Sequence, residues 1–108
     1  MMLIEETNVP DAVLPVEAFR MHLRLGTGFA QDGLQDPVLR SFLRAAMAAV
    51  EARTGKVLIT RRFALSLTFW RDAAAQVLPV APVQDIARVA LVARDGAETL
   101  VDPDRYWL

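Results

Sequence analysis

Cysteine is absent from this chain of 108 residues, and histidine occurs once, as His22. The first absence excludes disulfide bonds and cysteine-ligated metal sites, and it leaves the redox compartment open. A lone histidine without nearby paired carboxylates is not a convincing metal ligand or catalytic base, so we interpret His22 as a packing or surface residue. We therefore expect no metal and no cofactor.

Long apolar runs are also lacking, since no stretch approaches the roughly 20 residues needed to cross a bilayer. The opening sequence MMLIEETNVP has acidic residues where a secretory signal has basic ones, so we expect an intracellular protein with no membrane partner. The net charge is −1, from 12 basic and 13 acidic residues. With a net charge this close to zero, the protein has no overall positive electrostatic potential that would attract nucleic acid.

Catalytic patterns are missing as well. Ser41 falls inside a predicted helix and Ser66 on the polar face of a predicted strand, and neither lies in a nucleophile-elbow sequence. The acidic residues at 5–6 and 102–104 are too few for a calcium loop, and the GTG at 26–28 lacks the lysine of a phosphate loop. We therefore expect a protein that is not an enzyme.

Small aliphatic residues dominate what is present. Hydrophobic residues make up 54% of the chain, although only 7% of it is aromatic. The length fits one domain, which we expect to bury about two-thirds of its unfolded surface and to fold alone with little margin. The apolar share indicates surface buried against partners, although an alanine-rich composition alone could produce it.

The strongest local signal predicts a helix over residues 36–55, DPVLRSFLRAAMAAVEARTG. Asp36 suits the N-cap, Pro37 the first helical position, and Gly55 the left-handed residue that ends a helix. Helical spacing predicts one buried apolar stripe, formed by Leu39, Phe42, Leu43, Ala46, Ala49 and Val50. A different face, away from the core, carries Arg40, Arg44, Met47 and Glu51.

The segments before this helix have weaker signals. Residues 1–14 show no clear period and are interpreted as a flexible N-terminal arm, extended or loosely held, which precedes a domain over 15–108. A short helix is predicted over 16–25, with Glu17 and Arg20 near its ends or on its outer face. Gly26 and Gly28 end it, and a loop with Phe29 or Leu34 tucked inward leads to residue 35.

After Gly55 the apolar period changes to two. This pattern predicts a long strand over 57–69 with odd-numbered residues buried, and Arg61 is an exception that marks a bulge or an exposed end. Two prolines restrict 77–83 to an edge strand or an extended lead-in. A strand over 88–93, a hairpin turn at Asp95-Gly96, a return over 98–101 and a turn at 102–104 complete the chain.

Together these elements predict an α+β fold, in which a short helix and a long central helix pack on a small antiparallel sheet with hairpins. Four arginines in two pairs are candidates for contacts with a partner: Arg40, Arg44, Arg61 and Arg62. A solvated surface, an acidic partner surface and DNA phosphates are all open interpretations. Trp70 and Trp107 are candidate interface anchors, because an indole buries a large area, and core packing is an equal alternative for Trp70.

Several short sequence motifs are each weak signals alone, but their order and spacing together are characteristic of one protein family. They are HLRL at 22–25, Ala45-Ala46, Val50-Glu51, Thr54-Gly55-Lys56, Leu78-Pro79, Pro82-Val83, Ile86, Val89, Gly96 and Tyr106, with the long strand between Lys56 and Leu78. In this order the chain, from about residue 14 to its end, resembles the head–tail connector proteins of tailed bacteriophages.

The resemblance implies a structural virion protein, a head-completion or adaptor protein. Such proteins form a ring of identical subunits, expected to be a dodecamer on the portal protein. The ring extends the DNA channel and gives tail or stopper proteins their attachment platform. The resemblance thus implies a place at the head–tail interface of the virion, with host cytoplasm as the location during assembly and non-specific contact with channel DNA as an option.

Lys56 is the only lysine among the 12 basic residues, a composition that suits a high-GC host and thus a prophage or a gene transfer agent. Many relatives continue beyond the point where this chain ends, and their C-terminal segment often grips the portal. The alternative function is a small nucleic-acid-binding module that uses the helix face of Arg40 and Arg44.

Overall fold

Helix α3 (Asp36–Thr54) is the longest element of the computed structural model, which describes residues 1–23 and 36–108. Its end before Gly55 is as predicted, whereas Asp36, predicted as the N-cap, is already the first residue of the helix. Gly55 follows with a φ of 67°, and its N–H donates to the Glu51 carbonyl at 2.9 Å, so it ends the helix in the left-handed conformation. At the other end, the Asp36 carboxylate accepts a hydrogen bond from the Arg20 guanidinium.

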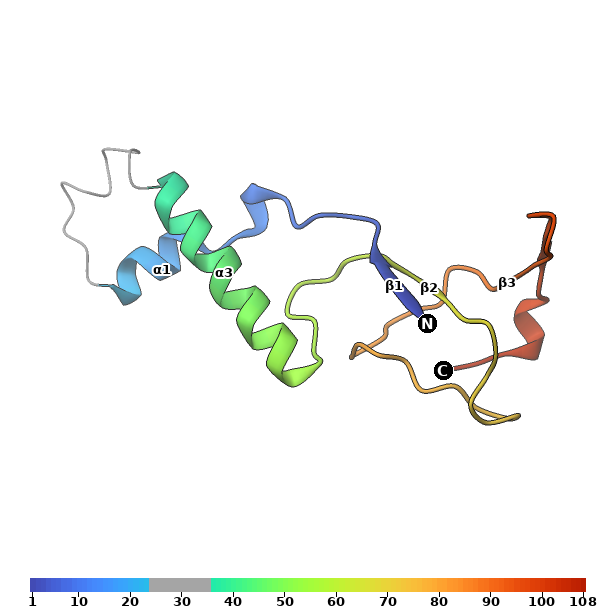
Figure 1. Cartoon of the computed structure of the whole chain (residues 1–108). Helices are drawn as coiled ribbons and strands as arrows, with labels where there is room; N and C mark the ends of the chain where they lie inside the picture. The colour runs from blue at the N-terminus through green and yellow to red at the C-terminus, as the bar shows by residue number, and fades with distance from the viewer. Residues whose placement is uncertain (24–35) are drawn as a thin grey trace.

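The shorter helix, α1 (Val16–His22), packs against α3 (Figure 1). The N–H of Leu23 donates to the Phe19 carbonyl at 3.0 Å and closes its last turn. The helix ends at His22, earlier than the predicted end at 25. The predicted stops at Gly26 and Gly28 and the inward Phe29 or Leu34 fall outside the described residues.

The N-terminal arm contributes strand β1 (Met2–Glu5), which pairs antiparallel with β2 (Phe63–Ser66). Met2 lies opposite Ser66, and the pairing continues past the strands, because the Glu6 N–H donates to the Arg62 carbonyl at 2.8 Å. The arm is therefore extended, as predicted, and backbone hydrogen bonds hold it in place. The domain boundary at residue 14 stays a prediction.

The strand predicted over 57–69 was too long. Only Phe63–Ser66 finds a partner strand within the described chain, because β1 itself is four residues long. Val57 pairs elsewhere: its N–H donates to the Ala81 carbonyl at 2.7 Å, in the extended segment that carries the two prolines. The predicted alternation is confirmed from 57 to 67, where every odd position is half-buried, including Arg61, which is neither a bulge nor an exposed end. It was wrong for Phe69, which is 73% exposed because the pairing has ended by then.

The predicted hairpin is confirmed as β3 (Ala90–Val92) paired antiparallel with β4 (Glu98–Leu100). Gly96 has a φ of 87°, which a residue with a side chain rarely adopts, and it allows the tight reversal. The Asp95 carboxylate accepts a hydrogen bond from the Ala97 N–H at 3.0 Å and fixes the turn.

Two short 3-10 helices complete the described elements. The first, η1 (Asp11–Val13), lies between β1 and α1. The second, η2 (Pro103–Arg105), follows β4 where a turn was predicted, and the Asp102 carboxylate caps it by accepting from the Asp104 N–H at 3.0 Å.

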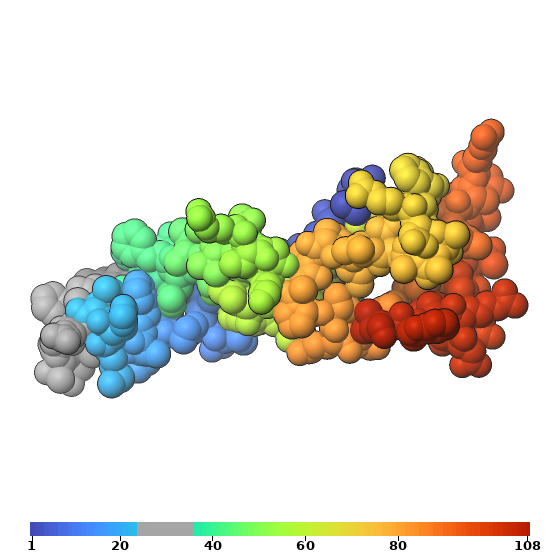
Figure 2. Space-filling view, turned by 90° about the horizontal axis from the view of Figure 1, so that it is seen from below, coloured from blue at the N-terminus to red at the C-terminus, as the bar shows by residue number. Residues whose placement is uncertain are grey.

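The molecule is elongated, with extents of 58 × 25 × 22 Å. Its radius of gyration is 19.3 Å, whereas a compact chain of this length has about 13 Å. The two helices lie at one end and the strands at the other, and the space-filling view shows the same long, narrow body (Figures 1 and 2). The α+β class is confirmed, but the strands form two separate two-stranded sheets, and α3 packs on α1 rather than on a sheet layer.

Few side chains are buried within the described residues, where the buried apolar ones are Val9, Leu14 and Leu39. The predicted core stripe of α3 was wrong beyond Leu39 and Leu43, because Phe42 is 60% exposed and Val50 46%. The arm covers the opposite side of α3, around Arg44, Met47 and Glu51.

The accessible surface of 9020 Å² exceeds the roughly 6,000 Å² expected for a compact monomer of this mass. The expectation that the chain buries about two-thirds of its unfolded surface on its own was therefore also wrong. A further partner surface would be needed to reach that burial.

We predict that Leu39→Ala lowers the free energy of unfolding of the monomer by about 2–5 kcal/mol, because it removes a buried leucine side chain. Phe42→Ala is the matched control on the same helix, and we expect a loss below about 1 kcal/mol from this exposed position. Urea unfolding of dilute protein followed by circular dichroism measures both. Equal losses would contradict the assignment of the buried face.

Candidate partner interface and the ion pairs behind it

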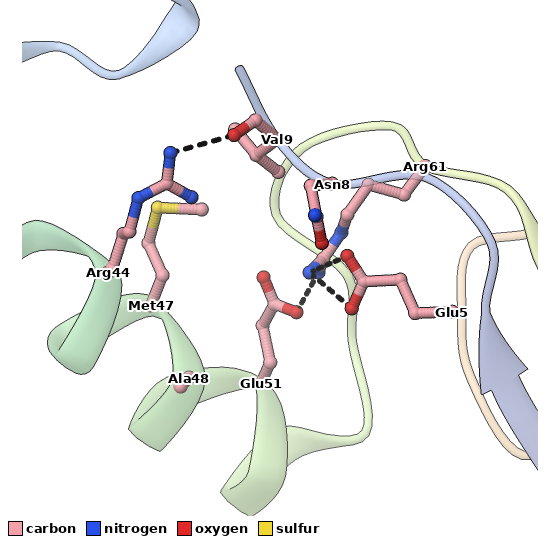
Figure 3. A pocket seen from close by; sticks show the side chains of 8 residues that line it. All are labelled: Glu5, Asn8, Val9, Arg44, Met47, Ala48, Glu51 and Arg61. Atoms are coloured by element: carbon pink, nitrogen blue, oxygen red, sulfur yellow. Dashed lines mark hydrogen bonds and ion pairs between the residues drawn. The ribbon is translucent and has the colours of Figure 1, made fainter. Parts of the chain in front are cut away.

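Arg61 lies between two carboxylates that come from different parts of the chain (Figure 3). Its Nη1 donates to both oxygens of Glu5 at 3.3 Å, and its Nη2 donates to Glu51. The side chain is 12% exposed, and its guanidinium lies 5.5 Å from the centre of the Phe63 ring. This group, the Arg61 clamp (Glu5, Glu51 and Arg61), ties the arm to α3 and to the segment that leads into β2.

The two carboxylates of the Arg61 clamp stabilise the positive charge of Arg61. Burial acts to lower the pKa of Arg61, but the hydrogen bond to Glu51 and the charge of Glu5 outweigh it and raise the pKa above its ordinary value. A partly buried pair of this kind contributes little net free energy compared with apolar side chains, yet removing one member leaves an uncompensated charge. The clamp therefore fixes position more than it adds stability.

Arg44 and Arg40 bind the arm a few residues further on. Arg44 Nη2 donates to the Val9 carbonyl at 2.8 Å and to Asp11 Oδ1 at 2.5 Å, and Arg40 Nε lies 3.8 Å from Asp11 Oδ2. The hydrogen bond from Arg44 lowers the pKa of the Asp11 carboxyl, with the charges of Arg44 and Arg40 adding to it. Both arginines thus have partners within their own chain.

Arg20 was predicted near an end of its helix or on its outer face. It does lie in the last turn of α1, but the outer-face alternative is wrong, because the residue is 5% exposed and donates to Glu17 at 2.5 Å and to Asp36. It joins α1 to the first turn of α3, a role that the sequence reasoning missed. The one local signal was the acidic Glu17, three positions earlier on the same helix face.

A hollow of about 410 Å³ lies between the arm and α3 (Figure 3). It is lined by Glu5, Asn8, Val9, Arg44, Met47, Ala48, Glu51 and Arg61. Four of these are charged, and each is hydrogen-bonded to a group of this chain. Among residues 1–23 and 36–108 there is no group of three histidine or acidic side chains placed to hold a metal, and no helix long and apolar enough to cross a membrane.

The six predicted contact residues do not form one site. Arg40, Arg44 and Arg61 bind acidic groups of their own chain. Arg62 is exposed, Trp70 is 52% exposed and Trp107 is 85% exposed. The role of these residues in a partner contact stays a prediction.

Large apolar side chains are exposed along much of the described chain. Two of the elements that carry them are α3, with Val38, Phe42 and Val50, and the hairpin with the C-terminal residues, with Leu91, Val92, Leu100 and Leu108. The N-terminal strand and the segments around Leu58, Phe69 and Val77 expose others. Because contiguous exposed apolar surface marks contact sites, the residues on α3 and on the hairpin end are candidates for a partner interface.

We predict that Arg61→Ala lowers the free energy of unfolding by about 3 kcal/mol, because Glu51 would stay half-buried without a cation. Arg62→Ala, at the next and exposed position, is the matched control and should change it by less than about 0.5 kcal/mol. Chemical unfolding at neutral pH tests the pair. Similar effects of the two substitutions would refute the Arg61 clamp.

The lowered pKa of Asp11 predicts a pH dependence. A depressed folded-state pKa gives stability that is present above the unfolded value of about 3.9 and is lost as the pH falls through the folded value. Asp11→Asn should therefore be less stable than the original chain at pH 6, and the difference should shrink as the pH falls below the unfolded value and through the lower folded value. Urea midpoints across this range measure it, and a constant difference would contradict it.

Solved structures of gene transfer agent (GTA) particles resemble this chain, whereas no protein-family model and no curated protein matches it. A chain in the neck of an empty GTA particle, computed with C6 symmetry, is 55% identical with a TM-score of 0.88 over 94% of this chain. A chain in the virion of a native GTA particle is 55% identical with a TM-score of 0.84, and one in a native neck computed with C12 symmetry is 47% identical with 0.81.

Each comparison covers 94% of this chain, but only 52%, 53% and 50% of the three matched chains. This chain therefore spans about half the length of the structures it matches. At this level of identity, the comparisons confirm the resemblance to head–tail connector proteins that the sequence indicated.

Proposed function

We propose that this chain is a structural protein of a virion neck, the head–tail adaptor of a gene transfer agent or a related particle. The observation that carries the proposal is 55% identity, over 94% of the chain, to a component of an empty GTA particle's neck. The proposal takes the location of that component, in a particle neck, as the guide to the location of this chain.

A ring of identical subunits is the proposed assembly. The matched necks were computed with C6 and C12 symmetry, and a closed ring needs two different, complementary surfaces on each subunit. This chain has two separate groups of exposed apolar residues, on α3 and on the hairpin end. It also has about 3,000 Å² more accessible surface than a compact monomer, within the 2,000–5,000 Å² that obligate interfaces bury.

In the proposed particle this ring lies beneath the portal protein at the head–tail interface. It continues the DNA channel and provides the platform for a tail or stopper protein, and it is assembled in the host cytoplasm. The charged side chains that line the hollow beside α3 are paired within the chain, Arg61 with Glu5 and Glu51, and Arg44 with Asp11, an arrangement that supports a structural role for them.

The alternative of a nucleic-acid-binding module loses its main support. It required the face of Arg40 and Arg44 to be available for phosphates, but Arg44 is hydrogen-bonded to Val9 and Asp11, and Arg40 lies beside Asp11. A phosphate there would compete with the carboxylate of Asp11 for the same two guanidinium groups. Weak, non-specific contact with DNA in the channel remains compatible with the adaptor.

We predict that the purified chain adds a ring of density to isolated portal complexes of its own particle, because each adaptor subunit meets the portal and its neighbours. Negative-stain electron microscopy of the mixture measures this, with portal alone as the control.

The alternative makes the opposite prediction, because phosphate contacts release counterions and bind more weakly as salt rises. A steep, salt-dependent affinity for short DNA duplexes, together with bare portals in the images, would refute the adaptor role.

A further inference from the structure

One face of α3 has no covering element within the described chain. Its residues recur at alternating spacings of four and three, which is the spacing of a seam that packs against another helix. We call this face the α3 seam; its members are Val38, Phe42, Ala45, Ala49 and Ala52. All five are exposed and none is charged, whereas the covered side of the helix carries Arg40, Arg44 and Glu51.

The composition of the α3 seam suits close packing. Alanine at three of its five positions leaves the helix slim, so a neighbouring element can approach near the lower end of the 8–10 Å range of helix packing distances. Phe42, 60% exposed, adds a large side chain that can anchor the contact. An apolar stripe of this regularity is buried in folded helices, yet here no described part of the same chain buries it.

We propose that the α3 seam binds a second copy of this chain, through a surface of that copy other than its own seam. This inference rests on the proposed function, because the ring supplies the second copy. The excess surface of about 3,000 Å² is enough for two obligate contacts per subunit, one on each side. Pairing of seam with seam would bury one side only and stop at a dimer, whereas a heterologous contact continues around a ring.

The test replaces one small residue of the α3 seam with a charged one. Ala49→Glu puts a carboxylate in the middle of the contact, and glutamate is a good helix former, so the monomer should fold normally by circular dichroism. The matched control is Ala48→Glu, which makes the same change one position away, beside Arg44 and off the seam. Light scattering across a concentration series measures self-association.

We expect the original chain and Ala48→Glu to assemble alike, and Ala49→Glu to need about 30-fold more protein or to stay monomeric. Mixing Ala49→Glu with the original chain tests the heterologous geometry. The variant keeps its second surface, so it should join one end of a growing assembly and leave short, open oligomers. If the variant instead stays monomeric and does not enter the oligomers of the original chain, then the α3 seams of two copies bind each other, and the inference is wrong.

Two further outcomes would also overturn the inference: normal assembly of Ala49→Glu, or an original chain that stays monomeric at every concentration. The proposed function is judged separately, by density on the portal. If Ala49→Glu still forms a ring on the portal, the inference fails and the adaptor role stands. If the original chain assembles through the seam but never binds the portal, the adaptor role fails and the inference stands.

Discussion

One guanidinium joins three parts of this molecule that are distant along the chain. Arg61 binds Glu5, 56 positions away in the arm, and Glu51, 10 positions away on α3. The arm that it holds supplies β1, and β1 is the strand that pairs with β2 in the described chain. Arg61 shares this task with Arg44, which binds Val9 and Asp11, while few apolar residues are buried along the arm. A charged contact here does the positioning that an apolar core does in most small domains.

The distribution of side chains on α3 explains why charged contacts, and not an apolar core, position the arm. Its arginine and glutamate face is turned toward the arm, and its alanine-rich face is turned outward. For a solitary protein this arrangement would be the reverse of what hydrophobic burial favours. It is reasonable for a subunit whose apolar face is covered by neighbours, as in the proposed ring. The chain then receives much of its burial from assembly, and its internal ion pairs keep it in the shape that assembly requires.

Local signals in the sequence predicted local structure well. Pro37 and Gly55 gave the bounds of α3, and Asp95-Gly96 gave the hairpin, because caps and turns depend on a few neighbouring residues. The candidate site was less predictable. Helical spacing shows which face of α3 is apolar, but whether this chain or another copy covers that face is decided by tertiary and quaternary contacts. The partners of Arg44 and Arg61 lie 33 and 56 positions away, beyond any local pattern.

The pairing of Met2 with Ser66 also constrains the order in which the chain reaches its shape during synthesis. The arm leaves the ribosome first, yet its partner strand is made more than sixty residues later. Arg44 of α3, which binds Asp11, leaves the ribosome before β2 does. The inner end of the arm can therefore meet its partner on α3 before Met2 can pair with Ser66.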